Sequence, residues 1–408
     1  MAVTQQHLPG VGMDDLYSER ARRAGAGHLG DPRNSAGKIS FFAGFPDPAS
    51  LPKADIAEAT RVALERDGEW ALQYGATQGF PGLIDELLKK LKRDQRINAT
   101  PDNILITNGG SQAVALITDM LVDPGDVILS ETPTWMGAVQ TFGASGAEVR
   151  EIPVDAGGTD VDALERALEA LRSDGRRAKL LYMIPNFQNP TGVTTTLARR
   201  QRIVALAQAH HVPLLEDDAY FDLRYSGETL PTLYTLDDSG LVMYMGTFSK
   251  IMAAGMRLGW VVATPAIIKQ LAGLKHEGGT SPFAGQVAAE FCSSGTLVEH
   301  VVELRALYHQ RRDVMLATLD SAMPAGTTWT TPEGGFFIWV TLPAGASVSR
   351  LVPSATERNI EFLPGSACYF QPATDDKIRL SYSFANEAQI REGISALGEL
   401  IAAQLAAR

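Results

Sequence analysis

Residues 242–257 read Val-Met-Tyr-Met-Gly-Thr-Phe-Ser-Lys-Ile-Met-Ala-Ala-Gly-Met-Arg, in which an apolar run leads to a lysine. The run at 242–246 has the length and composition of a buried strand. Lys250 follows it closely, and the hydroxyls of Thr247 and Ser249 lie beside it in the sequence. A lone lysine after a strand is usually a solvated surface amine. The rest of the chain must therefore show whether this amine is placed for chemistry.

Other apolar runs of strand length recur along the chain and alternate with helical patterns such as that of residues 197–210. Buried strands separated by helices are typical of an α/β fold. We therefore expect a large domain with a mostly parallel sheet that is covered by helices on both faces. The predicted strands are residues 104–107, 127–130, 148–152, 180–184, 212–215, 242–246 and 258–263.

Beyond about residue 290 the pattern changes to a long helix, two strands and a closing helix. We expect these elements at residues 298–322, 334–340, 377–381 and 387–407. They predict a smaller α+β domain, to which an N-terminal arm contributes. A length of 408 residues suggests two or three domains. The expected divisions are 1–50 for the arm and small-domain segment, 51–290 for the large domain and 291–408 for the small C-terminal domain.

Composition excludes several classes of function. The chain has 36 basic and 47 acidic residues, a formal charge of -11 and a pI near 5.2, which disfavours binding to nucleic acid or anionic membranes. It has no apolar run long enough to span a membrane, and its first residues do not resemble a signal peptide, so we expect a cytoplasmic protein. Cys292 and Cys368 are the only cysteines, and neither lies near metal-type ligands, so no metal site is predicted.

Ligands of open parallel sheets bind beyond the carboxyl ends of the strands. After the predicted strand 104–107, the residues Gly110, Ser111 and Gln112 open a helix. The free amides and the dipole of a helix start attract an anion. The alternative is an ordinary turn with a capping serine, which is the more common reason for such a sequence.

Two further strands end in polar residues. Asn189 lies in a proline-rich turn after residues 180–184, and Asp217 and Tyr220 follow the strand at 212–215. A carboxylate at the buried end of an apolar strand is costly without a cationic partner. Either an arginine or lysine from elsewhere in the chain or a cationic ring nitrogen of a bound ligand would meet this need.

Taken in order, these motifs resemble the class I/II aminotransferases of pyridoxal-phosphate fold type I. The motifs are Asn189-Pro190-Thr191-Gly192, Asp217 with Tyr220, Thr247-Phe248-Ser249-Lys250 with Arg257, and Arg379. The resemblance covers the chain from about residue 40 to its end. Residues 42–48 and 131–135 are most similar to the branch that holds 2-aminoadipate, aromatic and valine-pyruvate transaminases.

The resemblance implies that pyridoxal 5'-phosphate is the cofactor and that Lys250 is its Schiff-base lysine. Asp217 would pair with the ring nitrogen, while Asn189 and Tyr220 would donate hydrogen bonds to the phenolic oxygen. Trp135 would stack on the ring, where the family more often has tyrosine. The residues implied to bind the phosphate are Gly110, Ser111, Gln112, Thr247, Ser249, Arg257 and, from the neighbouring subunit of a homodimer with shared sites, Tyr74.

Arg379 matches the family arginine that grips the α-carboxylate of the substrate, and Gly44 and Asn189 are expected beside the substrate. One further departure is Ala254-Gly255, where Pro-Gly is frequent in the family. Neither this departure nor Trp135 removes a functional group.

The expected reaction is a ping-pong transamination between an L-amino acid and a 2-oxo acid, with 2-oxoglutarate as the expected acceptor. Another reaction of the same cofactor, by a lyase, decarboxylase or oxidase, is the first alternative. A ligand-sensing domain is the second, although the forty-three residues before Gly44 are too few for a DNA-binding head. Arg20, Arg22 and Arg23 either receive a distal substrate carboxylate or form a solvated basic face.

Overall fold

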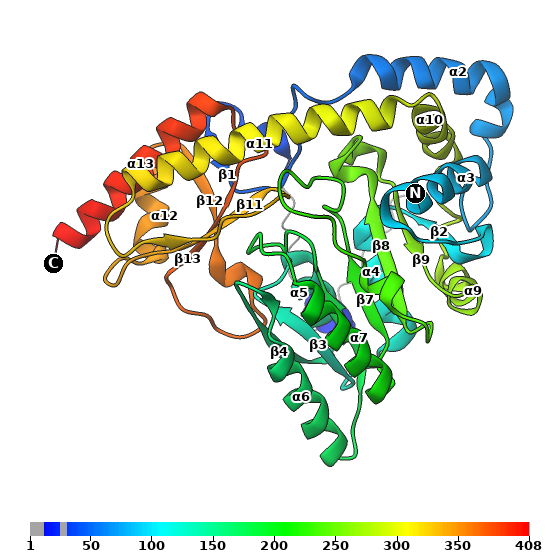
Figure 1. The fold of residues 1–408 in the computed structure, drawn as a ribbon, viewed down its shortest axis with the longest axis horizontal. Helices are drawn as coiled ribbons and strands as arrows, with labels where there is room; N and C mark the ends of the chain where they lie inside the picture. Colours follow the sequence, from blue (N-terminus) through cyan, green and yellow to red (C-terminus); the bar gives the residue numbers. More distant parts are fainter. Residues whose placement is uncertain (1–11, 25–30, 408) are drawn as a thin grey trace.

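The computed structural model describes residues 12–24 and 31–407, which form two β-sheets with helices around them (Figure 1). The larger sheet has the order β2-β9-β8-β7-β6-β3-β4-β5. Its central strands are parallel, whereas β9 is antiparallel to both of its neighbours and β5 is antiparallel to β4. This confirms the mostly parallel sheet. The strands are β2 (Ile104–Thr107), β3 (Val127–Thr132), β4 (Glu148–Asp155), β5 (Gly158–Thr159), β6 (Ala178–Met183), β7 (Leu214–Asp217), β8 (Val242–Thr247) and β9 (Gly259–Val262).

The central strands are continuous apolar runs because both faces of the sheet are buried. On β6, Leu180 and Tyr182 belong to one apolar core, and Leu181 and Met183 belong to another on the opposite face. Successive side chains of a strand point to opposite faces, so each strand contributes to both cores. Helices that supply these cores are α4 (Gly110–Leu121), α5 (Met136–Ser145) and α9 (Pro265–Leu274) for the first, and α6 (Val161–Ser173) and α7 (Leu197–His210) for the second.

The smaller sheet has the order β1-β12-β13-β11-β10 and confirms the second, α+β part of the predicted fold. Its first strand comes from the N-terminal part of the chain and pairs in parallel with β12. The strands are β1 (Ile39–Phe41), β10 (Thr328–Trp329), β11 (Phe337–Thr341), β12 (Ile360–Pro364) and β13 (Lys377–Ser381), and the helices are α11 (Thr296–Ala322), α12 (Val348–Glu357) and α13 (Glu387–Ala406).

The long helix α11 extends from beside the large sheet to the smaller one, where α13 packs against it (Figure 1). The domain limits at residues 50 and 290 stay a prediction. In the described part of the chain, no helix has both the length and the apolarity that crossing a membrane requires. The remaining α-helices are α1 (Glu19–Arg23), α2 (Lys53–Ala71), α3 (Pro81–Lys90), α8 (Leu233–Leu236) and α10 (Pro282–Ser293).

The strand expected at 334–340 begins only at Phe337, for a steric reason. Gly335 has a φ of 73°, and a Cβ atom on it would lie 2.6 Å from the Cβ of Phe187. The chain therefore passes close to Phe187 in a left-handed turn before it joins the sheet. This turn brings Phe336 and Phe337 toward the carboxyl end of β7, where Tyr220 contacts both rings.

Candidate active site

A cavity of about 790 Å³ lies beyond the carboxyl ends of β7 and β8 and reaches the smaller sheet. Most of the residues predicted from the sequence line it. They are Gly44, Gly110, Ser111, Trp135, Asn189, Asp217, Tyr220, Thr247, Ser249, Lys250, Arg257 and Arg379.

Two predicted residues do not line the cavity. The side chain of Gln112 accepts a hydrogen bond from the amide of Asn108 at 2.7 Å and donates one to Glu277 at 2.6 Å. Tyr74 is 89% exposed. The prediction for Gln112 concerns its main-chain amide at the start of α4, which these side-chain hydrogen bonds do not involve. The role predicted for Tyr74 requires a second copy of the chain nearby.

Lys250 ends a short 3-10 turn, Phe248–Lys250, directly after β8. Its Nζ donates a hydrogen bond to the carbonyl oxygen of Gly44 at 3.0 Å. Burial lowers the pKa of this amine to about 8, and the cations of Arg379 and Arg257 act in the same direction. A lowered pKa leaves more of the amine neutral near pH 7, which is the form that attacks carbonyl groups.

Asp217 is the last residue of β7 and is buried at the floor of the cavity. One oxygen of its carboxylate accepts a hydrogen bond from the hydroxyl of Tyr182 at 2.6 Å. Burial raises the pKa of this carboxyl to about 7, although the Tyr182 hydrogen bond acts in the opposite direction. Among the described residues, no lysine or arginine forms an ion pair with it. The site can therefore accept a cation from a bound molecule.

The two acids beside Asp217 in the sequence accept hydrogen bonds from other parts of the chain. Glu216 accepts hydrogen bonds from the amides of Leu233 and Tyr234, both at 2.9 Å, at the start of α8. Asp218 accepts one from the Asn186 side chain at 2.8 Å. Because successive residues of a strand face opposite sides, only the middle acid of the three lines the cavity.

An anion site lies where β2 leads into α4. Gly109 has a φ of 78°, and a Cβ atom there would lie 2.6 Å from a guanidinium nitrogen of Arg257. That guanidinium donates to the carbonyl oxygens of Asn108 and Ala254, each at 3.2 Å. The first amides of α4 have no partner within the helix, so they and Arg257 together favour an anion such as phosphate.

Thr247 and Ser249 shape the turn next to this anion site. The Thr247 hydroxyl donates to the carbonyl oxygen of Leu258 at 3.0 Å and accepts a hydrogen bond from the Ser249 amide at 3.1 Å. These contacts fix the turn that presents Lys250. Both hydroxyls also line the cavity.

Arg379 lies on β13 and is buried. Its guanidinium donates to the side-chain oxygen of Asn189 at 2.9 Å and to the carbonyl oxygen of Phe42 at 2.6 Å. The guanidinium carbon lies 4.1 Å from the centroid of the Phe337 ring. Its Nε is also buried and has no hydrogen-bond partner within the described residues. A planar cation with an unsatisfied donor is suited to a carboxylate ligand.

The far end of the cavity has side chains that the sequence did not identify. Trp135, which was predicted, precedes α5 and also lines the cavity. The other residues at this end come from five separate segments of the chain. They are Asn34, Ser35, Phe42, Met136, Gln140, Val352, Thr356, Ile360, Glu361, Phe362 and Pro364.

The three N-terminal arginines do not line this cavity. Arg20 pairs with Asp119 at 2.9 Å, and Arg23 pairs with Glu19 at 3.2 Å. Arg22 donates to the main-chain oxygen of Asp15 at 2.8 Å. In this structure their side chains therefore bind other parts of the protein surface.

Comparisons with known proteins agree on one family. The family model described as aminotransferase class I and II matches residues 37–397. The aromatic-amino-acid aminotransferase 1 of Thermococcus litoralis is 38% identical over 365 residues, which are 89% of this chain and 88% of that protein.

Two solved structures have the same fold over nearly the whole chain. One is the kynurenine aminotransferase of Pyrococcus horikoshii with PMP, kynurenine and its product, which has a TM-score of 0.90 and 37% identity over 96% of this chain and 98% of that one. The other is LysN, the alpha-aminoadipate aminotransferase of Thermus thermophilus with N-(5'-phosphopyridoxyl)-L-leucine. It has a TM-score of 0.89 and 31% identity over 98% of this chain and all of that one.

Proposed function

The chain belongs to the class I and II aminotransferases, which depend on pyridoxal phosphate, and we propose that it moves the amino group of an L-amino acid to 2-oxoglutarate in two separate half-reactions. The observation that carries this proposal is the meeting of Lys250, Asp217 and Arg379 in one cavity. An amine with a lowered pKa, a buried carboxyl without a basic partner and an arginine with an unused donor are the groups that such a transfer needs.

The residues present fit the cofactor. Asp217 is buried and forms no ion pair with a described lysine or arginine, and its burial raises the pKa of its carboxyl, so a protonated ring nitrogen would supply a counter-charge. The start of α4, with Arg257 against Gly109, would hold the phosphate group. When bound, the cofactor supplies a ring that accepts the electrons left on the α-carbon of the substrate after its proton departs.

Three side chains of this protein would then perform the remaining tasks. The Nζ of Lys250 would bind the cofactor aldehyde in the resting enzyme and would carry the α-proton during the reaction. Arg379 would orient the amino acid by its carboxylate, and Tyr220 and Asn189 would bind the phenolic oxygen. A carboxylate ligand would also satisfy the buried Nε of Arg379.

The two half-reactions can be tested one at a time. An amino acid alone should change the visible absorption of the loaded enzyme in one turnover, and 2-oxoglutarate alone should restore it. Initial rates at several concentrations of both substrates should give parallel double-reciprocal lines. Continuous release of product without a 2-oxo acid would instead favour the lyase, decarboxylase or oxidase alternative.

The far end of the cavity supports a preference for apolar or aromatic amino donors. Among the described residues that line the cavity, the basic side chains are Lys250, Arg257 and Arg379, each of which already has a proposed partner. Glu361 is paired with Lys38 at 2.5 Å, so it adds little net charge. A distal carboxylate would have to rely on neutral donors such as Ser35. We therefore expect phenylalanine, tyrosine, kynurenine or leucine to react better than 2-aminoadipate in a panel of donors.

We also propose a homodimer in which Tyr74 reaches the phosphate site of the second copy. Trp70, Leu72 and Tyr74 follow one another near the end of α2 and are 68%, 74% and 89% exposed, which is unusual for large apolar side chains. Light scattering should give twice the chain mass of 43.8 kDa. Tyr74→Phe should weaken cofactor binding about tenfold. A fully active monomer would exclude the shared site.

A further inference from the structure

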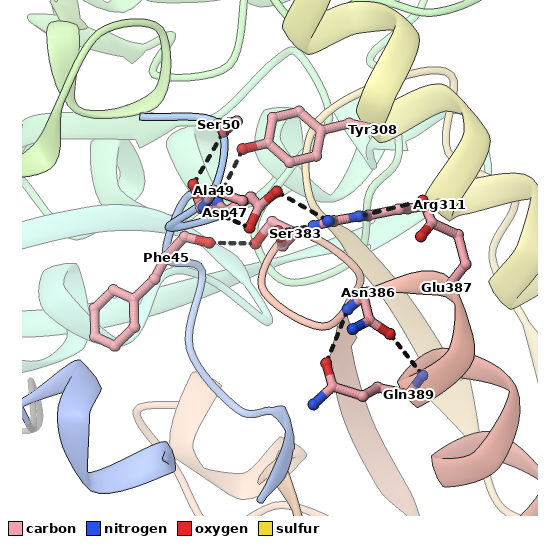
Figure 2. Close-up of polar contacts among 10 residues, drawn as sticks. All are labelled: Phe45, Asp47, Ala49, Ser50, Tyr308, Arg311, Ser383, Asn386, Glu387 and Gln389. Carbon is pink, nitrogen blue, oxygen red and sulfur yellow. Dashed lines mark hydrogen bonds and ion pairs between the residues drawn. The ribbon is translucent and has the colours of Figure 1, made fainter. Parts of the chain in front are cut away.

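A buried ion pair links the N-terminal part of the chain to α11, next to the cavity but outside it (Figure 2). The Nη2 of Arg311 donates to Asp47 at 2.9 Å, and Nη1 donates to the main-chain oxygen of Ser383 at 2.8 Å. The two charged side chains are only 5% and 10% exposed. The amide of Asp47 also donates to the hydroxyl of Tyr308 at 3.1 Å, so α11 holds Asp47 at two points.

The segment just before Asp47 carries three carbonyl oxygens that meet functional or supporting side chains. Phe42 accepts from Arg379 at 2.6 Å, Gly44 accepts from Lys250 at 3.0 Å, and Phe45 accepts from the Ser383 hydroxyl at 2.7 Å. The segment therefore contacts both of the cations that the proposed function requires.

Regular secondary structure does not hold this segment. Strand β1 ends at Phe41 and α2 begins at Lys53, and the residues between them form bends, turns and irregular backbone. A Cβ atom on Gly44 would lie 2.6 Å from the ring of Phe337, so the backbone passes very close to the cavity wall. The segment is therefore positioned by the hydrogen bonds to its carbonyl oxygens and by side-chain contacts, among which the Asp47–Arg311 pair is the buried ionic one.

Stability alone is a poor explanation for this pair. Replacing a buried ion pair with apolar residues is often neutral or stabilising, because both charges lose their hydration when they are buried. Moreover, the Nε of Arg311 is buried without a hydrogen bond, and its second acid, Glu387, lies 3.7 Å away. The two Nη atoms of Arg311 have a geometric role, because they join Asp47 to Ser383. Ser383 lies four residues beyond Arg379 in the chain.

We propose that Asp47 and Arg311 are positioning residues, which fix the 42–46 segment so that the carbonyl oxygen of Phe42 orients Arg379 and that of Gly44 accepts from the amine of Lys250 when this amine is free. The inference rests on the proposed function for its consequence in catalysis. A shift of the segment would move both carbonyl oxygens, and with them the groups that bind the cofactor aldehyde and the substrate carboxylate.

The test compares Arg311→Met with Lys90→Met in the cofactor-loaded enzyme. Lys90→Met on α3 also breaks a buried ion pair, with Asp222 at 2.7 Å, but Lys90 does not line the cavity. Arg311→Met should raise the KM for the amino donor or lower kcat, with a combined loss in kcat/KM of about tenfold to a hundredfold. Lys90→Met should lower the melting temperature while kcat/KM stays within about twofold of the wild type.

Hydrogen exchange of the 42–50 backbone gives a second measurement that does not depend on activity. Exchange in this segment should rise in Arg311→Met and remain as in the wild type in Lys90→Met. Equal exchange in all three proteins, or an equal loss of kcat/KM in both variants, would overturn the positioning role. If Arg311→Met does not fold, Ser383→Ala is the second variant, because it removes the hydrogen bond to the carbonyl oxygen of Phe45. It should also raise exchange in the 42–50 segment, and it should lower kcat/KM about threefold.

Failure of this inference can be separated from failure of the proposed function. If the wild-type enzyme transfers no amino group, the proposed function is wrong, and the exchange measurement still decides whether the ion pair fixes the segment. If the wild type is active and Arg311→Met matches it in both kcat/KM and exchange, only the positioning role is wrong.

Discussion

The two ends of the cavity are built in different ways. At one end, Asp217 is the last residue of β7, Lys250 follows the neighbouring strand β8, and α4 begins after β2 of the same sheet. At the other end, side chains such as Phe42, Gln140 and Val352 come from segments far apart in the sequence and from both parts of the molecule. The first end has charged side chains, whereas most side chains at the second end are neutral. Under the proposed function, the sheet would supply the reacting groups and the assembled end would select the amino acid.

The largest effect is expected at the end fixed by the sheet. Lys250→Ala should lower kcat by a factor of about 1,000 or more, because it removes both the nucleophile and the group that carries the α-proton. Lys250→Arg retains a positive charge but not a nucleophilic amine, and it should be equally inactive. Single-turnover measurements with each amino donor would check this, and near-normal turnover in either variant would break the assignment.

The charge on Asp217 should appear as a pH dependence of stability. The pKa of this carboxyl is about 7 in the folded protein, against an ordinary value of 3.8. The folded state therefore binds more protons than the unfolded state between about pH 4 and pH 7, so the cofactor-free protein should lose stability as the pH rises through this window. The loss from this group is at most on the order of 4 kcal/mol.

Asp217→Asn should remove this part of the slope. Urea unfolding of both cofactor-free proteins at pH 5 and pH 7.5 would measure it. Glu131, whose pKa burial also raises to about 7, titrates in the same window, and the charge of Asp217 adds a smaller part of its shift, so the difference between the two proteins includes that part. If the two proteins lose the same stability between these pH values, Asp217 does not carry an uncompensated charge.

Arg379 lies where the two ends meet and should affect the substrate without affecting the cofactor. Arg379→Ala should raise the KM for amino donors about a hundredfold, because two charge-assisted hydrogen bonds to the carboxylate are lost. The absorption spectrum and the cofactor dissociation constant should stay unchanged. A large loss of cofactor binding would instead assign this arginine to the fold or to the phosphate site.

The smallest effect is expected at the assembled end. Val352→Lys would add a positive charge to this end of the cavity, where the described residues have no unpaired cation. It should shift the ratio of kcat/KM for 2-aminoadipate over phenylalanine by about tenfold toward the acid. Val302→Lys, at an exposed position of α11 outside the cavity, is the control and should leave the ratio unchanged. No shift in either variant would mean that Val352 does not contact the substrate side chain.

The sequence was sufficient where chemistry follows from strand order. Apolar runs located the strands, and polar residues directly after them, such as Asn189 and Asp217, were brought into one cavity by the parallel arrangement. Strand β9 was located correctly, but its antiparallel direction depends on the tight turns between residues 248 and 258, which periodicity does not describe.

The sequence was not sufficient where a contact joins distant segments. Tyr182 looked like one more apolar strand residue, yet its hydroxyl binds Asp217. Phe42 contributes a main-chain oxygen, which no side-chain pattern can indicate. The side chain of Gln112 binds Glu277, which lies 165 residues further along the chain. The role proposed for Tyr74 requires a second copy of the chain, and a pattern within one chain cannot test it.

The most direct test of the central claim is to find where the cofactor is attached. The enzyme loaded with pyridoxal phosphate would be reduced with borohydride, digested, and examined by mass spectrometry. We predict one phosphopyridoxyl adduct, on the side chain of Lys250. An adduct on a different lysine, or none on a protein that retains its fold, would contradict the account.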